Sequence, residues 1–67
     1  MQITFNNQPH QIEANSTIQQ ALNSWIGDKQ KGIAVAVNEM VVPKIQWERY
    51  QLQLNDNVLV IKATQGG

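Results

Sequence analysis

Residues 16–27 read STIQQALNSWIG and decide the fold, because they carry the strongest helical pattern of the chain. Ser16 followed three residues later by Gln19 predicts a capping box at a helix N-terminus. The apolar residues that follow have the spacing of one helical face: Ile18, Ala21, Leu22, Trp25 and Ile26. Gly27 then stands where a left-handed residue commonly ends a helix. The stretch therefore predicts one amphipathic helix with a single apolar face.

On the N-terminal side of this helix, the sequence predicts a β-hairpin. Residues 1–6 alternate between apolar and polar, which is the period of a half-buried strand. Asn6 and Asn7 tolerate the left-handed backbone that a two-residue hairpin turn requires. Residues 8–13 form a weaker second strand, because Pro9 has no N–H to give to a ladder. We therefore expect this second strand at the edge of a sheet.

On the C-terminal side, the sequence predicts three further strands. Residues 33–37 read IAVAV and are apolar on both sides of the chain, as is typical of an interior strand. Residues 38–39 can make a tight turn into a short strand over residues 40–42. A polar turn at residues 55–57 precedes a last strand over residues 58–61, which again has apolar residues on both faces.

A short helical turn is expected between the last two strands. Pro43 ends the strand before it and favours the first position of a helical turn within residues 44–50. Such a turn would bring Ile45, Trp47 and Tyr50 close to one another. We expect these three side chains to plug one end of the core.

The order of these elements predicts an α+β fold of the β-grasp, or ubiquitin-like, kind. One helix can cover one face of a mixed sheet of about five strands. The first and last strands are expected to pair in parallel at the centre of that sheet. A chain of 67 residues allows a single small domain, residues 1–67. Within it, we expect residues 1–61 to be globular and residues 62–67 to form a flexible tail.

Charge and composition argue against several classes of protein. Five basic residues balance five acidic ones, which leaves no cationic surface for nucleic acid or anionic membrane. The absence of Cys removes disulfides, thiolate zinc sites and Cys nucleophiles. The longest apolar run, residues 33–37, is far shorter than the ~20 residues of a membrane span. We expect a cytoplasmic protein that is monomeric when alone.

Side chains that could carry chemistry are few and scattered. His10 has no second histidine to share a metal, which favours a solvated surface position. The carboxylates fall on separate elements, mostly at turns. Trp25 and Trp47 each lie in an apolar pattern, which favours core packing over a stacking platform for a base or sugar. A domain of this size also supplies little wall for a buried cofactor. We therefore expect that the protein is not an enzyme.

The six residues after the last predicted strand read KATQGG. They offer the domain neither a helix to cap nor a turn to close. Fully extended, six residues reach about 20 Å, which is enough to place a carboxylate in the active site of another protein. Glycine has no side chain to clash in a narrow channel. Gly66 and Gly67 therefore favour a tail that is the substrate of a partner enzyme, and an inert, frayed tail is the alternative.

Short motifs along the whole chain match one known family. They are Met1-Gln2-Ile3 with Asn6, Val35-Ala36-Val37-Asn38, Val41-Val42-Pro43-Lys44 with Trp47, Leu54 with Asp56 and Val58, and Gly66-Gly67. By these motifs the chain resembles the ThiS family, the sulfur carrier proteins of thiamine biosynthesis. Asn7 and Asn55 stand where that family commonly has glycine, and asparagine also tolerates a left-handed backbone.

The resemblance implies that Gly67 carries sulfur. In the family, an E1-like adenylating enzyme of the ThiF type uses ATP and Mg²⁺ to adenylate the carboxylate that corresponds to Gly67. A persulfide sulfur produced by a cysteine desulfurase then converts it to a thiocarboxylate, which donates sulfur to a thiazole synthase of the ThiG type. ATP and Mg²⁺ belong to the adenylating partner, so the resemblance implies no cofactor for this chain.

We expect the partner enzymes to dock on the sheet face that the single helix leaves open. The apolar residues on both faces of the last strand must leave some side chains on that open face, and an exposed apolar patch marks a docking surface. The candidate contacts are Val58, Leu59, Val60, Ile61, Lys62 and Gln65, beside the reacting residues Gly66 and Gly67.

Three other functions stay open. The small subunit of molybdopterin synthase shares the fold, the Gly-Gly end and the thiocarboxylate chemistry, but it tends to carry an aromatic or apolar residue where this chain has Thr64 and Gln65. A ubiquitin-like binding module with an inert tail is the second. A modifier conjugated to lysines of other proteins is the third. The intact mass of the protein separates the binding module and the modifier from a sulfur carrier.

Overall fold

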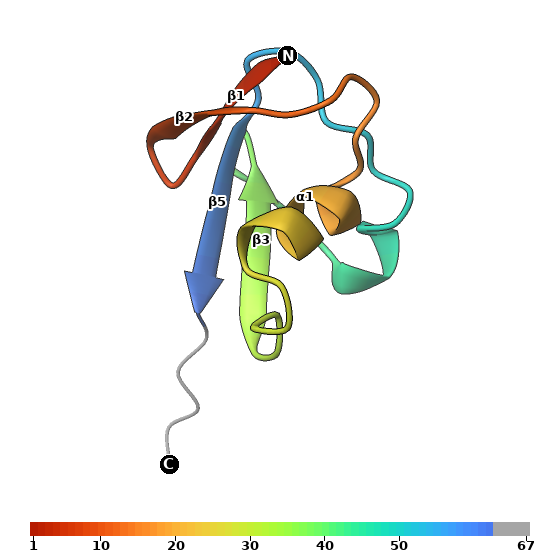
Figure 1. Cartoon of the computed structure of the whole chain (residues 1–67). Helices are drawn as coiled ribbons and strands as arrows, with labels where there is room; N and C mark the ends of the chain where they lie inside the picture. The colour runs from red at the N-terminus through yellow and green to blue at the C-terminus, as the bar shows by residue number, and fades with distance from the viewer. Residues whose placement is uncertain (63–67) are drawn as a thin grey trace.

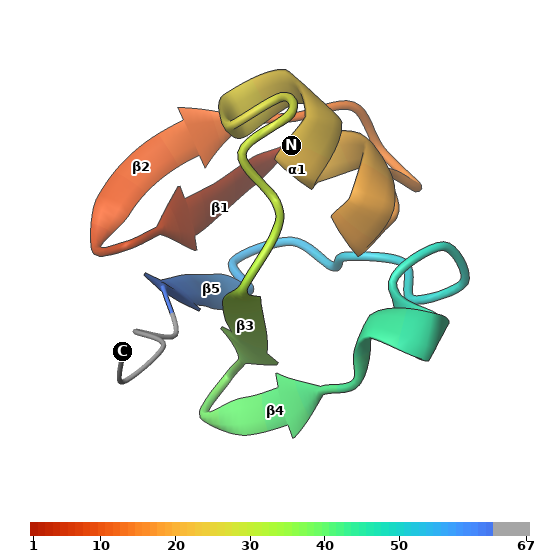
Figure 2. The ribbon, with the colours of Figure 1, turned by 90° about the horizontal axis from the view of Figure 1, so that it is seen from below.

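The apolar patterns of the sequence build a five-stranded mixed sheet with one helix in the computed structural model, which describes residues 1–62 (Figure 1). The elements are β1 (Gln2–Phe5), β2 (Gln8–Gln11), α1 (Ile18–Trp25), β3 (Ile33–Val37), β4 (Met40–Val42), the 3₁₀ turn η1 (Lys44–Gln46) and β5 (Asn57–Lys62). The strand order is β2-β1-β5-β3-β4. Figure 2 shows the sheet as a curved layer, with α1 and the segment around η1 on its concave side. No helix within residues 1–62 is long and apolar enough to cross a membrane.

The N-terminal hairpin forms as predicted. Asn6 and Asn7 have φ of 49° and 68°, which is the left-handed backbone that joins β1 to β2 in a two-residue turn. Phe5 pairs with Gln8 in the antiparallel ladder next to this turn. β2 lies at the sheet edge and ends at Gln11, two residues before the predicted boundary.

β5 lies at the centre of the sheet, between β1 and β3. It pairs in parallel with β1 through Thr4 and Asn57 and through Phe5 and Val58, which confirms the predicted pairing of the first and last strands. On its other side it runs antiparallel to β3 as far as Lys62. The strand therefore continues one residue beyond the predicted boundary at residue 61, and Lys62 belongs to the sheet.

The helix begins one residue later than the sequence pattern predicts. Thr17 is the N-cap: its Oγ1 accepts from the Gln20 N–H at 3.2 Å, and the Gln20 Oε1 accepts from the Thr17 N–H at 2.9 Å. The predicted box between Ser16 and Gln19 is wrong. Both pairs have the required spacing, but the Ser16 hydroxyl already donates to the Glu13 carbonyl at 2.7 Å in the preceding turn.

The helix ends at Trp25 with Ile26 as its C-cap, and Gly27 follows in the predicted left-handed conformation, with φ of 56°. A Cβ built at this position would meet nothing within 4 Å, so glycine is favoured by the backbone conformation and not by lack of space. The loop that follows is tied to the helix by side-chain amides. Gln30 donates to Asn23 Oδ1 at 2.8 Å and accepts from Gln19 at 2.7 Å.

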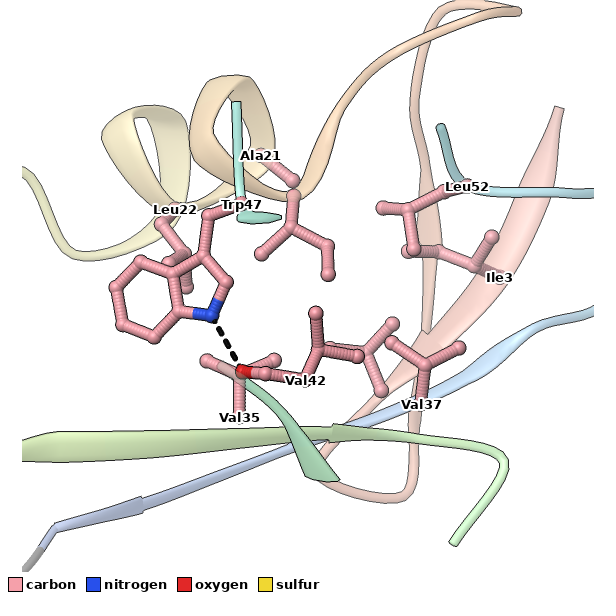
Figure 3. Close-up of a cluster of buried hydrophobic side chains, with 10 residues drawn as sticks. Ile3, Ala21, Leu22, Val35, Val37, Val42, Trp47 and Leu52 are labelled. Atoms are coloured by element: carbon pink, nitrogen blue, oxygen red, sulfur yellow. Dashed lines mark hydrogen bonds between the residues drawn. The ribbon is translucent and has the colours of Figure 1, made fainter. Parts of the chain in front are cut away.

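The core lies between the helix and the concave face of the sheet (Figure 3). Its fully buried side chains come from every layer of the fold: Ile3, Ile18, Leu22, Val35, Trp47, Leu52 and Val58. Trp47 lies deep in this cluster, and its Nε1–H donates to the Val42 carbonyl at 2.9 Å. The indole therefore fills the core and keeps its polar atom hydrogen-bonded.

The predicted plug around η1 is correct for two of its three side chains. Trp47 is buried and Tyr50 is half-buried against the core. Ile45 is 86% exposed, so its predicted place in the plug is wrong. In a 3₁₀ turn, residues three apart share a face, so a turn that directs Trp47 inward directs Ile45 away from the core.

Candidate functional site

The predicted partner contacts on β5 divide between the two faces of the sheet. Val58 and Val60 lie opposite Val37 and Val35 of β3, whose side chains are buried on the helix side. Leu59 and Ile61 alternate with them and therefore point to the face that α1 leaves open.

Burial decides which of these residues a partner can reach. Val58 is 0% exposed and belongs to the core, which corrects its prediction as a partner contact. Val60 is half-buried and packs against the core from the helix side. Leu59 is half-buried on the open face, whereas Ile61 is 57% exposed there. On the open face, the reachable apolar residues of β5 are thus Leu59 and Ile61.

Cross-strand neighbours extend these two side chains into a continuous apolar surface. Ala36 pairs with both Leu59 and Val41, and Ala34 pairs with Ile61, so all five side chains lie on the same face. Val41 is 72% exposed. We call this surface the open-face patch: Ala34, Ala36, Val41, Leu59 and Ile61. The two alanines between larger side chains leave it shallow, as suits a docking surface for another protein.

Three members of the open-face patch were not predicted from the sequence: Ala34, Ala36 and Val41. A signal was present, because the two-residue turn at Asn38 and Glu39 fixes the register of β3 against β4. That register places Val41 opposite Ala36 and Val42 opposite Val35.

A polar network holds the start of β5 in place. Asp56 is 7% exposed, and its carboxylate accepts from Asn38 Nδ2 at 2.9 Å and from the Gln53 N–H at 2.7 Å. Asn38 Oδ1 in turn accepts from the Asn57 N–H at 2.9 Å. Asp56 therefore serves local hydrogen bonding, as predicted for the turn carboxylates, although it is buried and not solvated.

The other end of β5 leads toward the predicted reacting residues. Lys62 is exposed and is the last residue that the structure describes. Gln65, Gly66 and Gly67 lie outside the described residues. Gly67 is five positions after Lys62, and an extended chain over five positions spans about 17 Å at most. A partner that holds Gly67 must therefore come close to the end of β5.

His10 lies in an aromatic cluster and not at a solvated surface position. Its ring is 5.5 Å from the Phe5 ring in an edge-on arrangement and 5.7 Å from the Trp25 ring, measured between centroids. Phe5 and Trp25 are 4.0 Å apart. The half-buried imidazole thus packs between β2 and α1. Within residues 1–62, no group of three or more His, Asp or Glu side chains is arranged to hold a metal ion.

A groove of about 510 Å³ lies between the β2–α1 connection and the exposed side of α1. Glu13, Ser16, Gln20, Ser24 and Trp25 are among its lining residues. Glu13 is the one carboxylate in the described lining, and no histidine or lysine stands beside it. Among residues 1–62, the groove lining therefore holds no pair of titratable side chains of the kind that acid–base sites commonly use.

Comparison with known proteins gives three findings. A model described as the ThiS family matches residues 3–67. The sulfur carrier protein ThiS of Escherichia coli strain K12 is 36% identical over 67 residues, which is the full length of both chains. The crystal structure of the thiamine biosynthesis protein ThiS from Geobacter metallireducens superposes with a TM-score of 0.88 over the whole of both chains at 17% identity. This structural match confirms the β-grasp fold predicted from the sequence.

Proposed function

Because this chain belongs to the ThiS family, we propose that it is a sulfur carrier protein of thiamine biosynthesis. The observation that carries the proposal is the sequence Gly66-Gly67: Gly67 is five positions after Lys62, the exposed end of the central strand, which carries part of the open-face patch. In this role the domain is a co-substrate: enzymes recognise its surface and modify its terminal carboxylate.

The carboxylate of Gly67 needs activation before it can accept sulfur. An α-carboxylic acid is ionised at neutral pH, and its delocalised anion is a poor electrophile. An E1-like adenylating enzyme of the ThiF type, which binds ATP and Mg²⁺, makes the Gly67 acyl adenylate and releases pyrophosphate. AMP is then the leaving group at the acyl carbon. The chain itself needs no bound cofactor for this step.

Sulfur enters when a persulfide displaces AMP. The terminal sulfur of a persulfide, generated by a cysteine desulfurase, attacks the acyl carbon, so that a C–S bond forms and an acyl disulfide results. A thiol then attacks the other sulfur of that acyl disulfide and forms a disulfide with it. The original S–S bond breaks, which releases the Gly67 thiocarboxylate. The thiocarboxylate sulfur is the nucleophile that a thiazole synthase of the ThiG type receives.

The open-face patch supplies recognition in this scheme. Ile61 and Val41 project from it, and it lies on the strand that leads to Gly67. We expect the adenylating enzyme and the thiazole synthase to use the same patch in turn. Because one patch holds one enzyme at a time, the carrier must leave the first enzyme before it reaches the second.

Intact mass spectrometry tests the proposal. The protein is incubated with the adenylating enzyme of its host, ATP, Mg²⁺, cysteine and a cysteine desulfurase. The expected result is a mass gain equal to the replacement of one oxygen by one sulfur, absent when Gly67 is deleted.

The controls decide how each other outcome is read. An unchanged mass, with the enzymes active on another carrier, would contradict the sulfur carrier function. A covalent adduct with another protein through a lysine would identify a modifier. Deletion of Gly67 should leave the circular dichroism of the domain unchanged, because residues 1–62 contain the whole described sheet and core.

A further inference from the structure

β5 has a strand on both sides over its first half and on one side over its second half. β1 accompanies it through the pair formed by Phe5 and Val58, where the parallel ladder ends. β3 accompanies it to the pair formed by Ile33 and Lys62. In Figure 1 the β1–β2 hairpin turns away at mid-length of β5, while β3 continues beside it.

The unaccompanied edge carries main-chain groups that point away from β3. The Asn6 N–H donates to the Val58 carbonyl at 2.9 Å, and the Val60 N–H donates to Asn6 Oδ1 at 2.8 Å. Alternate residues of a strand direct their N–H and C=O groups to the same side, so the Val60 C=O and the Lys62 N–H face this edge too. Within residues 1–62, no hydrogen bond reaches either of these two groups.

Asn6 shows that the edge accepts a hydrogen-bonding partner in line with β1. Its backbone turns away from β5 at φ of 49°, but its side-chain oxygen stands where the carbonyl of a continuing strand would stand. The Asn6 side chain thus accepts from the Val60 N–H, the first donor of β5 beyond the ladder with β1. The Val60 C=O and the Lys62 N–H are left for a partner.

The side chains around this edge are apolar on both faces of the sheet. Ile61 and Leu59 belong to the open-face patch on one side. Val60 packs against the core on the helix side and is only half-buried. An incoming strand has alternating side chains, so its two faces would each meet an apolar neighbour.

We propose that the edge of β5 from Val60 to Lys62 is a site for strand addition, and that its occupant is an extended segment of the adenylating enzyme, apolar at alternate positions. This rests on the proposed function, because an enzyme that holds Gly67 must lie within about 17 Å of Lys62. It also continues the docking surface of the open-face patch. Main-chain hydrogen bonds to a sheet edge give affinity with little dependence on side chains.

A proline substitution tests the main-chain contact directly. Lys62→Pro removes the N–H that faces the edge, and proline is tolerated where a strand has no neighbour on its N–H side. Lys62→Ala is the matched control, because it removes the side chain and keeps the N–H. We expect the KM of the carrier in ATP-dependent pyrophosphate release to rise about tenfold more for Lys62→Pro than for Lys62→Ala. Equal KM values, with both variants folded by circular dichroism, would overturn the strand-addition site.

Hydrogen exchange provides a second test on the unaltered protein. The Lys62 amide should exchange about tenfold more slowly in the complex with the adenylating enzyme than in the free carrier. The Ile61 amide, which faces β3, should change little and serves as the internal reference. Unchanged exchange at Lys62 in a saturated complex would overturn the proposal.

Two further outcomes separate this proposal from its rivals. If the unaltered carrier is never adenylated, the proposed function fails first, whatever the two Lys62 variants do. If Lys62 exchange slows when the carrier alone is concentrated, the occupant is a second copy of this chain, and the assignment to the enzyme is overturned.

Discussion

The two halves of β5 have different surroundings, although they belong to one strand. Val58 has β1 on one side, β3 on the other and the core above it, and it is 0% exposed. Ile61, three residues later, has β3 alone and is 57% exposed. Both are aliphatic β-branched residues, so residue type does not separate them. Their environments differ because β1 ends at Phe5, and the stability of the domain should therefore depend on the first half of β5 and recognition on the second.

The test with the largest expected effect places the same charge in each half of β5. Val58→Asp puts an unpaired carboxylate into the core, which costs several kcal/mol. A domain of this size is stable by about 3–10 kcal/mol at ~0.05–0.15 kcal/mol per residue. We expect Val58→Asp to abolish the cooperative urea transition. Ile61→Asp should stay within about 0.5 kcal/mol of the unaltered protein. A Val58→Asp variant that unfolds cooperatively at the same urea concentration as the unaltered protein would show that the stability of the domain does not depend on the first half of β5.

The second test removes the polar network at the start of the strand. Asp56→Ala leaves the Gln53 N–H and the Asn38 amide without their acceptor, which should cost about 2–3 kcal/mol. Asp28→Ala is the control, because Asp28 is exposed in the loop after α1. Chemical denaturation followed by circular dichroism measures both. Equal stability of the two variants would mean that Asp56 does not position β5.

The third test addresses recognition at the open-face patch. Ile61→Asp should raise the KM of the carrier for the adenylating enzyme by about tenfold or more, because an aliphatic contact worth ~1.5–3 kcal/mol is replaced by a charge. Ile45→Asp is the matched control: Ile45 is 86% exposed but lies on η1, on the other side of the sheet. A similar KM for both variants would remove the patch from the docking surface.

The test with the smallest expected effect concerns the boundary between the two halves of β5. Asn6→Gly keeps the left-handed turn but removes the oxygen that accepts from the Val60 N–H, so it should destabilise the domain by about 1 kcal/mol. Asn7→Gly, at the neighbouring turn position, should change stability by no more than about 0.5 kcal/mol. Thermal unfolding of the two variants compares them. An Asn6→Gly variant as stable as Asn7→Gly would show that the side-chain bond does not contribute.

Sequence patterns predict most of this fold, because its elements are set by short-range signals. The IAVAV run, the paired asparagines at the first turn and the apolar face of residues 18–26 each mark one element. The parallel pairing of β1 with β5 also follows, since it is the simplest way for one helix to cover a mixed sheet. These predictions use periodicity and backbone preference, which are properties of neighbouring residues.

The errors arise where a contact that the sequence pattern does not reveal decides between two local options. Ser16 and Thr17 are both good N-caps with Gln three residues later, and the turn around Glu13 occupies the serine. His10 looks like a surface residue in the sequence, but its ring packs against the Phe5 and Trp25 rings, which lie next to each other. The first choice depends on the conformation of the preceding turn and the second on packing between elements, and the spacing of residue types along the chain encodes neither.

The candidate site was predictable in outline. The β-grasp pattern together with Gly66-Gly67 indicates a sulfur carrier, and alternation on the last strand indicates an apolar open face. Which members of that strand face outward depends on the register with β3, and Val41 joins them only through the pairing of β4. The sequence therefore locates the candidate docking surface without specifying its members.

The central place of the last described strand also sets the order in which the domain can fold. Each hairpin, β1–β2 and β3–β4, closes over a two-residue turn and can form as soon as a growing chain has produced it. Neither hairpin pairs with the other until β5 has been synthesised, because Thr4 finds its partner Asn57 only 53 residues later. The sheet is therefore assembled by its last strand, and we expect folding to be limited by this long-range closure and not by the helix.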